Sequence, residues 1–195
     1  MTTVLRRSAV AAVAAGAVLT AGGTAAFAGS GTHATAPSAA HQTVVGGKTS
    51  IQLNSKTVNA LVHDKFSLAP TGNAKVTSTF ALVFHITGGT YTNPSAGTIK
   101  HSGGIKISKG SKSVTIKNLV LKLKAGEGTA AVSGKGRIAA LKVGPAQNGS
   151  QNSFGGYTVK LSKAAIKFLD KKFSTKAFKK HPTLGTGTTT LKFKK

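Results

Sequence analysis

The chain has 195 residues, of which 27 are lysine or arginine and only 3 are aspartate or glutamate, so its formal net charge is +24. It contains no cysteine, which excludes disulfides, thiolate metal sites and cysteine nucleophiles. Hydrophobic residues make up 39% of the chain, and this share at this length is typical of one ordinary globular domain. The strong positive charge predicts either an anionic partner or a solvated basic surface.

The N-terminal residues have the pattern of a secretory signal peptide. Arg6 and Arg7 precede a short stretch rich in alanine and valine, and Ala-Phe-Ala at 26–28 is an A-x-A cleavage pattern. The apolar stretch is too short to cross the ~30 Å hydrocarbon core of a membrane. We therefore expect residues 1–28 to be removed by cleavage after Ala28, which predicts a secreted, extracellular or cell-wall-associated protein.

The rest of the chain divides into a spacer and one domain. Residues 29–47 are small, polar and aperiodic, which is typical of a flexible spacer. Residues 48–195 are predicted to form a single β-rich domain. No later stretch in the sequence is apolar for long enough to predict a transmembrane helix.

The first half of this domain begins with a strand and a helix. Residues 49–53 alternate in polarity as a short strand does, and Asn54 or Ser55 can cap a helix that ends near His63. The clearest strand pattern covers 75–87. The side chains expected to face inward on that strand are Val76, Phe80, Leu82, Phe84 and Ile86.

Residues 97–143 predict a meander of antiparallel strands. Aliphatic residues alternate with polar ones, mostly lysine, and glycines punctuate the runs. The alternation changes phase between Ile116 and Leu119, and such a change moves side chains to the opposite face. We therefore predict a bulge or bend near Asn118.

The C-terminal part predicts a polar loop, a helix and a last strand. Residues 144–156 are polar, a strand covers 159–161, Ser162 can cap a helix, and residues 188–193 form the last strand. The predicted fold is mainly β, either an antiparallel β-sandwich or an open barrel-like sheet, with two short helices.

The sequence offers little for catalysis or metal binding. Its acids are Asp64, Glu127 and Asp170, and it has no G-x-S-x-G motif. The Gly-Gly-Lys-Thr sequence at 46–49 lacks the earlier glycine of a phosphate-binding loop. No two histidines have H-x-H or H-x-x-x-H spacing. We therefore expect a protein that is not an enzyme and holds no metal ion.

The abundance of lysine is the most prominent feature of the sequence, and it indicates which kinds of partner the protein could bind. A one-sided positive field concentrates anions, so an anionic cell-wall polymer, acidic lipid, extracellular nucleic acid or an anionic small molecule are candidate partners. The use of lysine in place of arginine argues against bidentate recognition of nucleic-acid bases or phosphates. The alternative is a solvated face that only confers solubility. The predicted polyanion-binding face consists of Lys100, Lys106, Lys122, Lys163, Lys167, Lys171, Lys179 and Lys180.

Residues 97–107, which read Gly-Thr-Ile-Lys-His-Ser-Gly-Gly-Ile-Lys-Ile, resemble the G-T-V-x-F-S-G-x-V-x-F segment of HtaA-type haem-transport domains from actinobacterial secreted or surface proteins. The run 114–123, the Gly-Arg-Ile-Ala sequence at 136–139 and the terminal helix and strand continue the similarity, which covers 49–195. The resemblance implies a β-rich domain with two short helices that binds haem through an axial tyrosine in the first helix, steadied by a histidine.

The residues that would carry haem binding depart from the family pattern. The first helix, at 57–63, contains no tyrosine, and the family's G-H-x-G turn reads Lys-Gly-Ser-Lys at 109–112. His63, Tyr91 and His101 are the substitute iron ligands that we consider. The sequence thus predicts a secreted or surface-associated, non-enzymatic binding protein that resembles an HtaA-type domain with a lost or altered haem site. The alternative is a basic secreted protein that binds polyanions.

Overall fold

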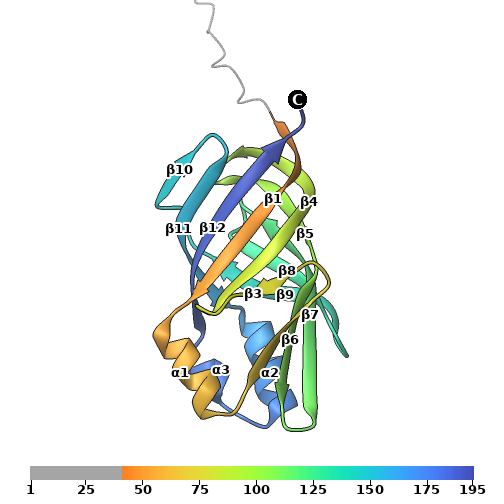
Figure 1. Cartoon of the computed structure of the whole chain (residues 1–195), viewed down its shortest axis with the longest axis vertical. Helices are drawn as coiled ribbons and strands as arrows, with labels where there is room; N and C mark the ends of the chain where they lie inside the picture. Colours follow the sequence, from red (N-terminus) through yellow and green to blue (C-terminus); the bar gives the residue numbers. More distant parts are fainter. Residues whose placement is uncertain (1–40) are drawn as a thin grey trace, which may run out of the picture. The chain divides into compact units, whose positions relative to one another are not determined.

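Residues 41–195, which the computed structural model describes, form a barrel of strands with helices at one end (Figure 1). The predicted signal peptide, its cleavage at Ala28 and the spacer as far as residue 40 lie outside the described residues. The strands are β1 (Gln42–Leu53), β2 (Ser67–Thr71), β3 (Lys75–Val76), β4 (Ala81–Asn93), β5 (Ala96–Ser102), β6 (Gly104–Lys109), β7 (Lys112–Lys122), β8 (Glu127–Val132), β9 (Gly136–Val143), β10 (Asn148–Ser150), β11 (Ser153–Leu161) and β12 (Thr183–Phe193). The helices are α1 (Ser55–His63), α2 (Lys163–Phe173) and α3 (Ala177–Lys180).

Eight of the strands close into a ring. Their order is β7-β5-β4-β1-β12-β11-β9-β8, and β8 pairs back with β7 through antiparallel register. The expected mainly β, antiparallel fold is confirmed, but the architecture is a closed barrel and not a sandwich or an open sheet. Period-two alternation specifies which side chains face inward, whereas closure depends on which strands pair, so the pattern could not decide between these architectures.

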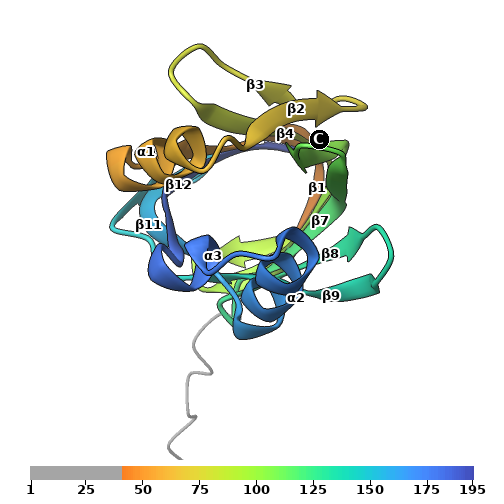
Figure 2. The same cartoon turned by 90° about the horizontal axis from the view of Figure 1, so that it is seen from below.

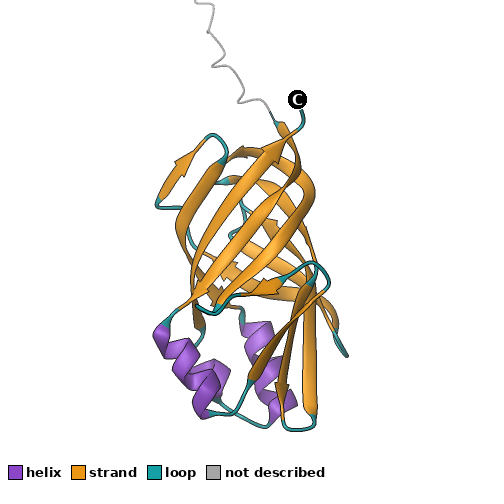
Figure 3. Cartoon of the chain, in the orientation of Figure 1, coloured by secondary structure: helices purple, strands orange, loops and turns teal. Residues whose placement is uncertain are grey.

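The remaining strands extend this ring without breaking it. β6 continues the sheet from the first half of β7, and β2 pairs with β6. The short strands β3 and β10 pair with β4 and β11. Figure 3 shows the helices gathered at the end of the barrel where β6 and the start of β7 project.

The phase change in the meander produces the predicted bulge. The register of β7 against β8 shifts between Lys117 and Val120, and Asn118 has φ 54°. Arg137 donates to the Asn118 carbonyl at 3.2 Å. The bulge is confirmed, and it lets side chains on both sides of the phase change face the core.

The strand predicted over 75–87 is wrong as a single element. It is split into β3 and β4 by a turn in which the Phe80 and Ala81 N–H groups donate to the Thr77 carbonyl and hydroxyl oxygens at 3.0 and 2.9 Å. Phe80 has φ 59° and is 41% exposed, so it does not face the core as predicted. Threonine offers a side-chain acceptor that competes with strand pairing, which explains the turn. Of the predicted inward set, Leu82, Phe84 and Ile86 are buried.

The helix starts follow the predicted caps. Asn54 Oδ1 accepts from the Thr57 N–H at 2.8 Å, and Ser162 Oγ accepts from the Ala165 N–H at 3.0 Å. These bonds satisfy backbone donors that have no partner within the helix. The third helix, α3, is a correction to the predicted two helices. With four residues it is too short to produce a helical repeat in the sequence.

Several strands are longer than predicted because glycine and threonine occupy inward positions. β1 begins at Gln42, so residues 42–47 of the predicted spacer belong to the barrel. β12 begins at Thr183, and its Gly187 lies directly against the ring of Tyr157, where a Cβ atom would clash. The large ring of Tyr157 therefore requires glycine at the facing position of β12. Because glycine stands where a hydrophobic residue would otherwise face inward, the sequence of β12 lacks the alternation that predicts a strand.

Candidate functional site

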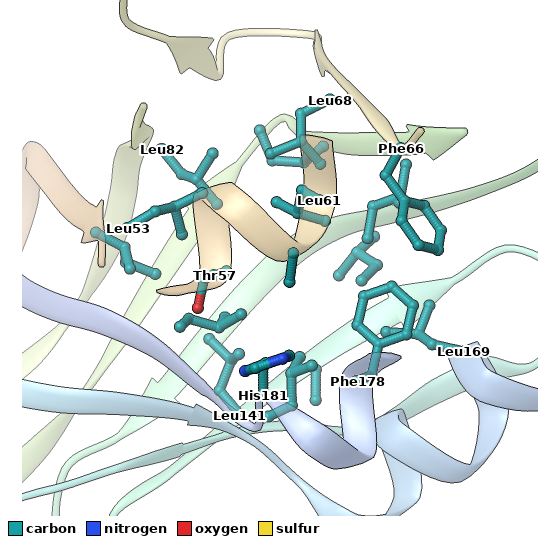
Figure 4. Close-up of a pocket in the computed structure, with 18 of the residues that line it drawn as sticks. Leu53, Thr57, Leu61, Phe66, Leu68, Leu82, Leu141, Leu169, Phe178 and His181 are labelled. Atoms are coloured by element: carbon teal, nitrogen blue, oxygen red, sulfur yellow. The ribbon is translucent and has the colours of Figure 1, made fainter. Parts of the chain in front are cut away.

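A cavity of about 100 Å³ lies between the lower end of the barrel and the helices. Figure 2 shows α1, α2 and α3 arranged around this mouth of the ring. Figure 4 shows Thr57 and Leu61 of α1 on one side and Leu141, Phe178 and His181 on the other. Nearly all of the lining is hydrocarbon. The barrel strands contribute inward-facing side chains to the lining, namely Ile51, Leu53, Leu82, Phe84, Leu119 and Leu161.

Helix α1 forms an apolar wall of the cavity, because the polar side chains at its start form hydrogen bonds with β12. Thr57 lines the cavity and is buried, but its hydroxyl donates to the Thr183 carbonyl at 2.7 Å. The Asn54 side-chain amide donates to the same carbonyl at 3.0 Å. These bonds fasten the start of α1 to β12, and they leave Ala60 and Leu61 to present hydrocarbon to the cavity.

An aromatic cluster forms another wall. The Phe66 ring centroid lies 5.1 Å from that of Phe173 and 5.2 Å from that of Phe178, in edge-to-face geometry. Such pairs stabilise by about 0.5–1.5 kcal/mol beyond area burial. The Lys109 ammonium lies 4.9 Å from the Phe66 centroid. This cluster joins the segment after α1 to α2 and α3, and so closes the side of the cavity.

The residues considered as substitute iron ligands do not come together, and none of them lines the cavity. The His63 side chain is 87% exposed at the end of α1, with Nδ1 3.1 Å from Asp64 Oδ1. Tyr91 is buried inside the barrel, where its ring stacks on Phe154 at 5.7 Å and on Phe193 at 5.8 Å.

His101, the other residue of that set, belongs to a buried chain of hydrogen bonds inside the barrel. Because the Leu119 carbonyl can only accept, His101 Nδ1–H donates to it at 3.0 Å, and Nε2 accepts from the Thr49 hydroxyl at 2.8 Å. Thr189 then donates to Thr49 at 3.0 Å, and the Tyr157 hydroxyl donates to Thr189 at 2.7 Å. Each hydroxyl in the chain has a partner, as buried polar groups require.

Burial keeps both ends of this chain uncharged. It lowers the pKa of His101 from 6.5 to about 4, against the opposing effect of the bond to the Leu119 carbonyl. Burial also raises the pKa of Tyr157 to about 12. The chain therefore orders the barrel interior at neutral pH, and its histidine is a neutral structural group.

Sequence reasoning missed His181, which lines the cavity just after α3 and is half-buried. No motif marks it, because its neighbours in the cavity come from separate elements. Lys117, on β7, is also a lining residue. In residues 41–195, no group of three or more histidine, aspartate or glutamate side chains is placed to hold a metal ion.

The lysines of the predicted polyanion face are all exposed. They come from separate places: Lys100 and Lys122 lie on the barrel strands β5 and β7, Lys106 lies on β6, and the others lie on α2 and α3. The helical corner is the densest part. Its exposed lysines are Lys163, Lys167, Lys171, Lys172, Lys176, Lys179 and Lys180.

Asp170 is the acid within this corner, and its carboxylate is already engaged. It accepts from the Phe178 and Lys179 N–H groups at 3.1 Å each, which caps α3. Asp64 pairs with His63. Over residues 41–195, no helix is both long and apolar enough to span a membrane.

No protein-family model matches the sequence, and no curated protein matches it. Solved structures do match. The C-terminal domain of HtaA from Corynebacterium glutamicum is 17% identical, with a TM-score of 0.55 over 77% of this chain and 99% of that domain. The N-terminal domain of the same protein is 15% identical, with a TM-score of 0.53 over 76% and 98%.

The haem-binding protein HtaB from the same organism is also similar. It is 10% identical, with a TM-score of 0.52 over 80% of this chain and 96% of HtaB. The chain therefore has the HtaA-type fold, and the resemblance seen in residues 97–107 and beyond is confirmed at the level of the fold. At identities this low, the similarity establishes a shared fold but does not show that this chain binds the same ligand.

Proposed function

We propose that this chain is a secreted or cell-surface, non-enzymatic binding domain that holds a small apolar molecule in the cavity below the barrel. The observation that carries the proposal is the cavity itself, lined by hydrocarbon from the barrel mouth, α1 and α3. Concave apolar sites are the usual binding sites for small ligands. The shared fold with HtaA and HtaB, of which HtaB is a haem-binding protein, supports a binding role, and the leader pattern supports export.

A catalytic role has no support from the described acids. General acid–base catalysis needs a titratable group within reach of a substrate. Asp64 pairs with His63 and Asp170 caps α3. Glu127 lies on β8 opposite Lys142 of β9 and does not line the cavity. Binding is therefore the function to test.

The cavity lining lacks the haem ligands that the resemblance implies. Helix α1 presents Thr57 and Leu61 to the cavity where the resemblance implies an axial tyrosine. Among the lining residues, His181 is the single side chain that is a common iron ligand. We therefore propose that this domain binds an apolar ligand other than haem.

Titration of the purified protein with haemin and with 1-octanol tests this proposal. We expect 1-octanol to raise the thermal unfolding midpoint in a saturable way, because a ligand that binds only the folded state stabilises it. We expect Ala60→Leu, which fills the cavity, to abolish the shift. Ala164→Leu, at an exposed position of α2, is the matched control and should keep it. Absence of any shift in the wild-type protein, or a saturable Soret band with haemin that resists salt, would overturn the proposal.

A second candidate function is polyanion binding by the lysine-rich corner. It is favoured by the exposed lysines of α2 and α3, whose one nearby acid, Asp170, is engaged by backbone donors. Binding of this kind is sensitive to salt, because released counterions drive it. Retention on heparin that is lost steeply with rising salt, and weakened by Lys167→Gln with Lys171→Gln, would support it. Passage through the column at low salt would exclude it.

A further inference from the structure

Three lysines of helix α2 form one row on its outer side. Lys163, Lys167 and Lys171 are four residues apart, so they share one side of the helix, each about 6 Å further along its axis. All three are exposed, and Figure 2 shows α2 at the outer edge of the barrel mouth. The helix packs on β7 and β9 through its opposite side, whose buried residues are Ala165, Leu169 and Phe173. The row therefore faces solvent over a length of about 12 Å.

The lysines of this row lie where they do not stabilise the helix. Like charges four residues apart on a helix repel each other. Lys163 is in the first turn, where the helix dipole disfavours a cation, and that turn contains no acid. Asp170 follows Lys167 by three residues, but its carboxylate accepts from the Phe178 and Lys179 N–H groups. Within the described part of the chain it forms no ion pair within 4 Å. Charges that disfavour the helix and lack a partner in the chain indicate a partner outside it.

The surroundings of the row limit the chemistry of that partner. Lysine is a compact charge without the planar fork with which arginine recognises phosphates and bases, and Arg137 on β9 already donates to the Asn118 carbonyl. Proteins that bind single-stranded nucleic acid also use exposed aromatic rings, and helices that insert into a membrane surface use exposed apolar ones. Over residues 41–195, the large hydrophobic side chains that are exposed all lie outside α2 and α3, and they are Val45, Val62 and Phe80.

We infer that the row of Lys163, Lys167 and Lys171 binds a linear acidic polysaccharide, which lies along α2 with its carboxylate or sulfate groups on the three ammonium groups. This inference rests on the second candidate function and adds the position and the chemical class of the polyanion. A spacing of about 6 Å between lysines is close to the length of one sugar ring, so a single chain contacts the row in succession. Each contact is a charge-assisted hydrogen bond, and it offsets the repulsion between neighbouring lysines.

Two triple variants with the same net charge test the position. The row variant is Lys163→Gln with Lys167→Gln and Lys171→Gln. The control replaces three exposed lysines of the same corner that lie outside the row, namely Lys172, Lys176 and Lys179, by glutamine. We expect the row variant to bind heparin about tenfold or more weakly, because three exposed charge contacts are lost. The slope of log affinity against log salt should become shallower by about 2–3, because three fewer counterions are displaced.

The control variant should lose less than about threefold at 0.15 M salt, where charges more than about 8 Å apart are largely screened. Circular dichroism checks that both variants are folded. An equal loss of heparin binding in the two variants would show that general positive charge attracts the polymer, and it would overturn the inference while polyanion binding stands.

A set of four polyanions tests the chemical class. Heparin, polygalacturonate, poly(dT) and phosphatidylglycerol vesicles are compared with the full chain at one salt concentration. We expect both polysaccharides to bind, and poly(dT) and the vesicles to bind more weakly than either. Tighter binding of poly(dT) or of the vesicles than of both polysaccharides would overturn the inference and keep polyanion binding. Absence of binding to all four at low salt would overturn both.

Discussion

The two ends of the barrel interior differ in how they are filled. Toward the end far from the helices, aromatic rings stack from Tyr91 through Phe154 to Tyr157, and the hydroxyl of Tyr157 starts the buried chain that ends on His101. At the helical end, aliphatic side chains meet across a cavity of about 100 Å³. An eight-stranded barrel has an interior that side chains can just fill or that can hold one small ligand. This chain does the first at one end and, we propose, the second at the other.

The largest expected effect comes from emptying the packed end. Phe154 is fully buried between two other rings, so Phe154→Ala removes contacts that the closed barrel cannot easily collapse to replace. We expect the free energy of unfolding to fall by about 3–5 kcal/mol, measured by urea denaturation. A loss below about 1 kcal/mol would mean that this end is as loosely filled as the other, and the comparison would fail.

Acid is the next perturbation, and it acts at the packed end through His101. The pKa of His101 is about 4 in the folded state and near 6.5 when unfolded, so the unfolded chain binds more protons between these values. Stability is therefore complete above pH 6.5 and falls as the pH drops toward 4, by about 3 kcal/mol at most.

Urea denaturation at pH 4 and pH 7.5 measures this dependence. His101→Gln cannot titrate, so the difference between the two pH values should shrink in that variant. His63→Gln, at an exposed position, should retain the wild-type difference. An identical pH dependence in all three proteins would contradict the role assigned to the buried histidine.

Adding volume should distinguish the cavity from the filled part of the core. Ala130 is 0% exposed on β8 and does not line the cavity, so Ala130→Leu forces extra atoms into a filled interior, at a cost of about 1–3 kcal/mol. Ala60 lines the cavity, so Ala60→Leu places the same atoms in empty space and should leave the unfolding midpoint unchanged or raised. Equal destabilisation by both substitutions would show that the cavity has no usable volume.

The smallest effect concerns the one hydroxyl in the cavity lining. Thr57→Val removes the bond to the Thr183 carbonyl but keeps the shape, and the Asn54 amide still donates to that carbonyl. We expect a loss of about 1 kcal/mol with no change in 1-octanol binding. A loss of ligand binding in this variant would mean that the hydroxyl contacts the ligand, which would contradict binding through hydrocarbon contacts.

Local features of the fold could be predicted from the sequence, and they are those that depend on neighbouring residues. The cap by Asn54, the cap by Ser162 and the bulge near Asn118 each follow from a few adjacent positions, and the structure contains all of them. The resemblance in 97–107 indicated an HtaA-type domain, which the solved structures confirm at the level of the fold. Ring closure between β7 and β8 could not be predicted, because period-two alternation is the same in a sheet that stays open.

The candidate site itself could hardly be predicted from the sequence. Its lining combines Ile51, Leu61, Leu141 and Phe178 from distant elements, and each of these residues is what an ordinary core position would contain. The residues that we considered as substitute iron ligands do not lie at the cavity: His63 is exposed, and Tyr91 and His101 belong to the packed interior.

The central claim is that the helical end of the barrel holds an apolar cavity that admits a ligand, while the other end is filled. The most direct measurement is a methyl NMR titration of the full chain with benzene, a small neutral apolar probe. We predict saturable shifts for the methyl groups of Leu61 and Leu141, and none for Ile99 and Val159, which are fully buried and do not line the cavity. Shifts that never saturate, or that affect Ile99 and Val159 equally, would contradict the account.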